Sequence, residues 1–174
     1  MNARVLFVVG VLSFAAPAVA AGQGISVQGN VGTQINAGGH NQSVSLVFSP
    51  NEHLDFLVSG ERIHLPTEAT DFSATRGGTA TFISGEVRVS PFSSNRVSPY
   101  VLASFGRGKS RPNVNDLFPD PVTNDVWLLF VGGGVRFPLT GRLSAFADVR
   151  AGIEGERDTI FLLVPVRGGV AWRF

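Results

Sequence analysis

The sequence predicts an all-β protein, a closed antiparallel up-and-down transmembrane β-barrel of eight strands. Residues 160–174 alternate between an apolar set and a second set that carries two arginines, so one face of this segment is continuous hydrocarbon. Similar stripes recur about eight times along the chain. Short and long connections alternate between several of the stripes, which is typical of a barrel with lipid outside and polar groups inside.

The first three strands are predicted at residues 24–36, 42–49 and 54–65, where apolar and polar side chains alternate. Val47 breaks the alternation, because it stands among serines on the polar face. The side chains expected to face lipid are Ile25, Val27, Val31, Thr33, Ile35, Val44, Leu46, Phe48, Leu54, Phe56 and Val58. Turn-forming residues bound each segment, as expected for strands that cross a bilayer at a tilt.

The next three strands are predicted at residues 79–92, 99–110 and 125–139. The outward side chains of the first and third of these are Ile83, Val87, Val89, Trp127, Leu129, Val131, Val135 and Phe137. In the middle segment Val101 and Phe105 compete with Tyr100 and Leu102 for the lipid side. The facing of that strand therefore stays open.

The last two strands are predicted at residues 143–156 and 160–174. Their outward side chains are Leu143, Ala145, Ala147, Val149, Ala151, Ile153, Ile160, Leu162, Val164, Val166, Gly168, Val170, Trp172 and Phe174. An even number of strands brings the last beside the first, so the sheet closes and leaves no unpaired edge in hydrocarbon. Aromatic residues near strand ends, among them Tyr100 and Trp172, suit interfacial girdles.

The connections give a second signal. Residues 50–53, 93–96 and 140–142 are turn-like, whereas residues 66–78 and 111–124 are long and polar. Short turns at one rim and long loops at the other are typical of outer-membrane barrels, which places both termini on the periplasmic side.

Residues 1–20 are predicted to be a secretory signal peptide cut after Ala20, which leaves residues 21–174 as one domain. The apolar stretch is shorter than the roughly 18 residues of a spanning helix. The chain contains no cysteine, so disulfides, thiolate chemistry and lipoprotein anchoring are excluded. Without Arg4 the formal charge is zero, and no nucleic-acid partner is expected.

These features, together with the ending Val170-Ala171-Trp172-Arg173-Phe174, resemble the small eight-stranded outer-membrane barrels of Gram-negative bacteria, the OmpA/OmpX-like group. The resemblance covers the whole mature chain. It implies location in the bacterial outer membrane, contact with outer-membrane lipid, and an assembly signal at Val170, Trp172 and Phe174 for the barrel assembly machinery. It supplies no catalytic motif to carry over, and a peptidoglycan-binding domain like that of the longer family members is not expected.

Charged side chains gather on the predicted inner faces, five acids and five bases. They are Asp55, Glu61, Glu86, Arg88, Arg136, Asp148, Arg150, Glu154, Arg167 and Arg173. An eight-stranded barrel is just wide enough to be filled by side chains, so these charges are expected to pair as a network that seals the lumen and fixes register. The alternative is a gated pore or ion path.

Other candidate chemistry is weaker. Residues 103–110 nearly match a phosphate-binding loop, but no helix or βαβ unit follows them. His40, His53 and His64 fall in predicted turns or near strand ends without a local nucleophile, and the loop acids lack the spacing of a calcium loop. No catalytic, cofactor or metal site is therefore expected.

The sequence thus favours a non-enzymatic outer-membrane barrel with a structural or surface-interaction role through residues 66–78 and 111–124. Three alternatives stay open: a narrow passive porin-like channel, a lipid-modifying barrel enzyme, and a soluble periplasmic barrel that holds an apolar ligand. In the soluble barrel the apolar stripes point inward.

Overall fold

The computed structural model describes residues 24–66, 68–69, 74–75, 77–92, 96–114, 119, 123–156 and 159–174. The predicted signal peptide, residues 1–20, lies outside the described residues. Within them the chain consists of strands and turns, with no helix that has the length and hydropathy to cross a membrane.

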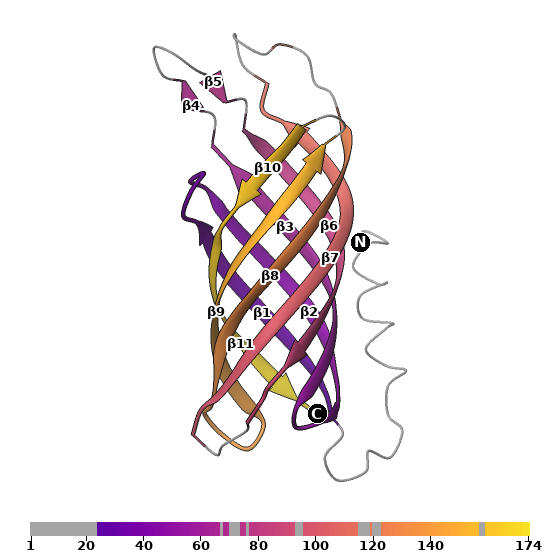
Figure 1. Cartoon of the computed structure of the whole chain (residues 1–174), viewed down its shortest axis with the longest axis vertical. Coiled ribbons are helices and arrows are strands. Elements are labelled where there is room, and N and C mark those ends of the chain that lie inside the picture. The colour runs from indigo at the N-terminus through magenta and orange to yellow at the C-terminus, as the bar shows by residue number, and fades with distance from the viewer. Residues whose placement is uncertain are drawn as a thin grey trace, which may run out of the picture.

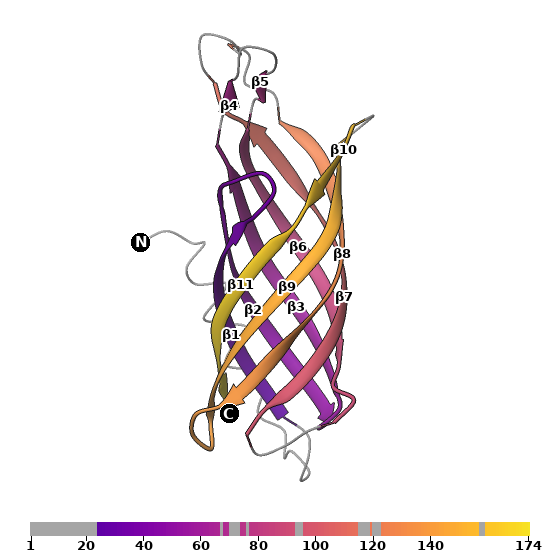
Figure 2. The same ribbon diagram turned by 60° about the vertical axis from the view of Figure 1, so that its left-hand side comes forward.

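Long antiparallel strands form the wall of a barrel (Figures 1 and 2). They are β1 (Gly24–Gln34), β2 (His40–Asn51), β3 (Leu54–Leu65), β6 (Gly78–Val89), β7 (Ser98–Pro112), β8 (Asn124–Pro138) and β9 (Leu143–Glu156), followed by β10 (Thr159–Leu163) and β11 (Pro165–Arg173), which share the eighth place. Each long strand pairs with the next one along the chain, β10 and β11 both pair with β9, and β11 pairs with β1 from Ser26 opposite Arg173 to Gln34 opposite Pro165. The predicted closed eight-stranded barrel is confirmed.

The last predicted strand, residues 160–174, is interrupted at Val164. Pro165 has no N–H to donate to a ladder, and β10 pairs with β9 alone. The Asn36 side chain takes the place of the missing strand partner: its Oδ1 accepts from Val164 N at 2.8 Å and its Nδ2 donates to Leu162 O at 2.6 Å. The first strand consequently ends at Gln34 rather than at Asn36, before a turn with positive φ at Gly38 and Gly39.

The outer wall is apolar, as the alternation predicts. Large hydrophobic side chains are exposed on every strand of the wall, and most of the polar side chains at the alternate, inner positions of the same strands are buried. The structure also decides the facing of β7, because Val101 and Phe105 are exposed while Tyr100 and Leu102 are buried inside the barrel. Tyr100 is therefore a lumen residue and takes no part in an aromatic girdle.

The two ends of the barrel differ (Figures 1 and 2). The turns after β2 and β8 lie at the end that holds the C-terminus, whereas the short turn after β1 lies at the other end, where β3 and β7 end and β6 and β8 begin. Within the predicted loop 66–78 the chain forms a small two-stranded sheet, β4 (Glu68–Ala69) with β5 (Ala74–Thr75).

Candidate functional site

An ionic cluster fills the middle of the lumen and is built from β6, β9 and β11. Arg88 Nε lies 2.5 Å from Glu86 Oε1, and Arg150 Nη1 lies 2.6 Å from Glu86 Oε2. Arg150 Nε lies 3.0 Å from Asp148 Oδ1. Arg167 holds the same carboxylate with two nitrogens, Nε at 3.0 Å from Oδ1 and Nη2 at 3.1 Å from Oδ2. This forked geometry is the strongest form of the arginine–carboxylate pair.

Strand geometry explains why these residues meet. Glu86 and Arg88 are two positions apart on β6, and Asp148 and Arg150 are two positions apart on β9, so each couple points into the barrel. Asp148 faces Arg167 directly in the register of β9 and β11. The pair of Glu86 with Arg150 instead crosses the lumen, because β7 and β8 lie between their strands.

Polar and aromatic side chains complete the cluster. Arg88 Nη1 donates to Gln28 Oε1 of β1 at 2.8 Å, and the Tyr100 hydroxyl donates to Asp148 Oδ2 at 3.1 Å. The Arg88 guanidinium also lies 4.9 Å from the centroid of the Tyr100 ring and 5.3 Å from that of Phe146. Such cation–π contacts add attraction where the cation is desolvated.

The buried bases of the cluster are compensated by ion pairs. Arg88, Arg150 and Arg167 are buried together with Glu86, Asp148 and Glu61, and Glu61 interacts electrostatically with Arg150. Burying a charged side chain costs about 5 kcal/mol per ion unless nearby groups of opposite charge compensate it. The ion pairs that Glu86 and Asp148 form with the three arginines supply that compensation.

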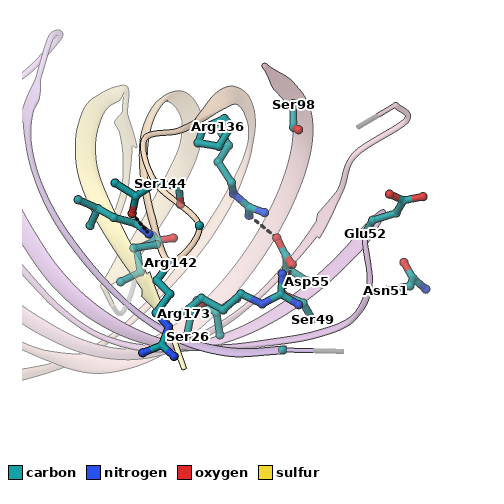
Figure 3. A pocket seen from close by; sticks show the side chains of 18 residues that line it. Ser26, Ser49, Asn51, Glu52, Asp55, Ser98, Arg136, Arg142, Ser144 and Arg173 are labelled. Carbon is teal, nitrogen blue, oxygen red and sulfur yellow. Dashed lines mark hydrogen bonds and ion pairs between the residues drawn. The ribbon is translucent and has the colours of Figure 1, made fainter. Parts of the chain in front are cut away.

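The remaining four predicted lumen charges lie outside this cluster. Asp55 of β3 pairs with Arg136 of β8 near the short-turn end, where the Ser49 hydroxyl also donates to Asp55 Oδ1 at 2.5 Å. Figure 3 shows Asp55 and Arg136 directed toward each other in the cavity at that end, which Arg173 also lines. Glu154 is buried and lines a cavity at the other end. The predicted charges therefore occupy three regions instead of one, and Arg173 lies exposed at the short-turn end of the barrel.

An apolar layer, which the alternation pattern missed, fills the lumen toward the long-loop end. Its buried members are Ile63, Ala80, Phe82, Val126, Leu128, Phe130 and Leu163. A signal for it exists in the sequence, since residues 126–131 are apolar at every position and so supply both the outer face and an apolar inner face.

Cavities open at both ends of the barrel. The one at the short-turn end has a volume of about 500 Å³ and reaches Gln28, which holds Arg88 of the ionic cluster. The one at the long-loop end has a volume of about 570 Å³ and reaches Ile63 and Leu163 of the apolar layer. The ionic cluster and the apolar layer thus lie between the two cavities.

The other candidates from the sequence do not assemble into a site. His53 Nδ1 lies 2.9 Å from Ser90 O, His64 Nδ1 lies 3.1 Å from Thr79 Oγ1, and the rings of His40 and His64 are 5.1 Å apart. Residues 103–110 lie within β7, so they form no phosphate-binding loop. Among the described residues no group of three or more histidines and acids is placed to hold a metal ion.

Comparison with known proteins identifies the fold. No protein-family model and no curated protein sequence matches this chain. Neisserial surface protein A superposes with a TM-score of 0.68 at 16% identity over 90% of this chain and 100% of that one. The N-terminal β-barrel domain of Pseudomonas aeruginosa OprF gives 0.60 at 14% identity over 88% and 99%. The attachment invasion locus protein Ail of Yersinia pestis gives 0.57 at 14% identity over 88% and 99%.

The chain has the fold of a small eight-stranded outer-membrane β-barrel. In this barrel the final segment lies on the outer wall, where Val170, Trp172 and Phe174 are exposed. Phe174 N donates to Ile25 O at 3.1 Å and so ties the end of the chain to β1. The three side chains form a continuous apolar stripe beside the seam that closes the barrel.

Proposed function

We propose that this protein is an integral outer-membrane barrel without enzymatic activity, which contributes to membrane structure and to surface interactions. The observation that carries the proposal is the belt of exposed hydrophobic side chains around the whole wall, together with ion pairs that cross the lumen. Large exposed apolar patches mark contact with a membrane or another protein, and a belt around a whole barrel matches the lipid-facing band of transmembrane barrels. A soluble barrel with an apolar ligand needs the opposite facing.

The orientation follows from the ends of the barrel. Short turns face the periplasm in outer-membrane barrels, so the end with the C-terminus is periplasmic and the long connections point outward. In this proposal residues 1–20 are a signal peptide cleaved after Ala20, and the barrel assembly machinery reads Val170, Trp172 and Phe174. The partner of the outward connections is unknown.

The experiment is the gel mobility of the detergent-extracted membrane fraction, with and without boiling. A heat-dependent shift together with membrane recovery supports the proposal, since only a closed barrel keeps its compact form in detergent. Recovery in the soluble periplasmic fraction without a shift contradicts it. Intact mass of the purified protein tests cleavage after Ala20 in the same preparation.

A narrow passive channel is the second candidate, favoured by the cavities that enter the lumen from both ends. Against it stand the ionic cluster and the apolar layer between them. Recording from the protein in a planar bilayer separates the two functions. Discrete conductance steps support the channel, and their absence at barrel densities verified by gel shift supports the closed lumen.

A further inference from the structure

Four basic side chains interrupt the apolar outer wall near the long-loop end of β3 and β7. Arg62, Arg107, Lys109 and Arg111 are all exposed and occupy outward positions of their strands. An outward charge is costly at the middle of a bilayer and tolerated near its interface. The four residues therefore mark the level where lipid headgroups begin.

The sheet register sets the spacing of the central pair. Arg62 of β3 and Lys109 of β7 both face Thr81 of β6, the strand between them. Two inter-strand steps separate the backbones of Arg62 and Lys109 by about 10 Å. Two long cationic side chains on either side of a short threonine leave space for one phosphate group between them.

A surface groove of about 710 Å³ follows this arrangement. Arg62, Lys109 and Arg111 line it together with the hydroxyl-bearing residues Thr79 and Thr81. The groove combines three cations with hydrogen-bond donors, which is the chemistry that recognises a phosphate monoester.

A second groove of about 700 Å³ joins the first, because Arg62 and Thr81 line both. It runs toward the apolar belt over Gly29 and Gly60, with Val44 between their strands. A Cβ built on Gly29 or Gly60 meets no atom within 4 Å, so the space above these glycines is open. This groove has the apolar character that an acyl chain requires.

One carboxylate faces the basic groove. Asp125 of β8 is exposed and stands opposite Lys109 in the register. Glu61 is the neighbour of Arg62 in sequence but points into the lumen. Among the described residues no ion pair joins Arg62, Lys109 or Arg111 to a carboxylate, so the groove carries a net positive charge.

We propose that this face binds a phosphorylated lipid of the outer leaflet, with its phosphate between Arg62 and Lys109 and one acyl chain over Gly60 and Gly29. The inference rests on the proposed membrane location and orientation. The joined basic and apolar grooves match the two parts of such an amphiphile, whereas a free phosphate ion uses the basic groove alone.

The test is native mass spectrometry of the detergent-purified protein titrated with lipid A, a diphosphorylated glycolipid. The double variant Arg62→Gln with Lys109→Gln is expected to bind lipid A about tenfold more weakly or worse, because two charge-assisted contacts are lost. Arg142→Gln removes an exposed arginine from the opposite end and serves as the matched control with unchanged binding. Heat-dependent gel mobility verifies that each variant is a closed barrel.

Two further measurements distinguish binding of the acyl chain from binding of the phosphate alone. In Gly60→Leu the new side chain occupies the apolar groove, where a Cβ on residue 60 meets no atom within 4 Å. This variant is expected to weaken lipid A binding although all the basic side chains stay in place. Inorganic phosphate at the same concentration is expected not to displace lipid A. Unchanged binding in the double variant overturns the site, and displacement by inorganic phosphate or a silent Gly60→Leu overturns the acyl-chain part.

The outcomes also separate this inference from the proposed function. Wild-type protein that is absent from the membrane fraction defeats the proposed function first. Wild-type protein that inserts and shifts on the gel, yet binds lipid A no better than the double variant, defeats the lipid site alone.

Discussion

Glu86 of β6 and Arg150 of β9 form an ion pair of 2.6 Å across the lumen, although two strands of the wall separate them. Sheet hydrogen bonds hold each strand to its neighbours and fix nothing across the barrel. This pair, with the bond from Arg88 to Gln28 of β1, braces opposite sides of the wall against each other. The cluster therefore couples strands that have no ladder in common.

Glu86→Gln is expected to destabilise the barrel by about 3–5 kcal/mol. The Glu86 carboxylate pairs with both Arg88 and Arg150, so its loss leaves two buried arginines with one partner fewer. The free energy of unfolding in detergent, from urea titration followed by tryptophan fluorescence, measures the loss. Glu52→Gln, at an exposed turn, is the control with little change. Charge reversal of Arg150 without loss of stability argues against a packed network.

Replacing both partners gives a sharper form of the same experiment. In the double variant Glu86→Met with Arg150→Met only Arg88 is left without its carboxylate, whereas Glu86→Gln deprives both arginines of it, so part of the loss of Glu86→Gln is expected to return. A double variant that is less stable than the sum of its two single variants contradicts this account.

Leu128→Ala is expected to cost about 2–5 kcal/mol, because Leu128 is 0% exposed in the apolar layer and its removal leaves a cavity. Leu129→Ala is the matched control on the next residue of the same strand. Leu129 is 44% exposed on the outer wall, where detergent or lipid fills the space and no cavity forms. Equal losses in the two variants contradict the assigned facing of β8.

The wall of this barrel was predictable from local patterns. The strands at Leu54–Leu65 and Leu143–Glu156 have the predicted bounds, because apolar residues recur at every second position over Leu54–Val58 and Leu143–Ile153 and turn-forming residues flank both strands. The facing of β7 was not predictable, since Tyr100 and Leu102 on one face and Val101 and Ala103 on the other leave neither face polar over residues 100–103. Tyr100 points inward, where its hydroxyl finds Asp148, a residue 48 positions away.

The interior was predictable in composition but not in arrangement. Alternation places Glu86, Asp148 and Arg150 on inner faces, yet which acid meets which base depends on the register around the closed sheet. Alternation alone also does not predict burial at strand ends. Arg173 occupies an inward position of its strand, yet its side chain is exposed at the end of the barrel. The apolar layer could be predicted only from the unbroken apolar run at residues 126–131, which supplies apolar side chains to both the outer wall and the lumen.

Asn36→Ala is expected to loosen the junction of β10 and β11. Its amide makes two hydrogen bonds to the main chain of residues 162 and 164, and their loss costs about 1–2 kcal/mol. Hydrogen exchange of the segment 159–165 is expected to speed up while exchange in β2 and β3 is unchanged. Asn36→Asp keeps the acceptor for Val164 N and loses the donor, so an intermediate effect is expected; protection equal to wild type in Asn36→Ala refutes the bridge.

Gly152→Ala is expected to destabilise the barrel by about 1–3 kcal/mol, because an added methyl group overpacks the lumen. Gly152 faces Phe130 in the register of β8 and β9, and a Cβ there lies 2.8 Å from Phe130 Cα, with the ring and Leu129 O closer still. Gly85→Ala is the control on the outer wall, where a Cβ meets no atom within 4 Å. The measurement is the midpoint of the heat-dependent gel shift. Combining Gly152→Ala with Phe130→Leu is expected to restore part of the lost stability, since leucine leaves free some of the space that the phenyl ring occupied. If stability does not recover, the clash of the added methyl group with the main chain dominates.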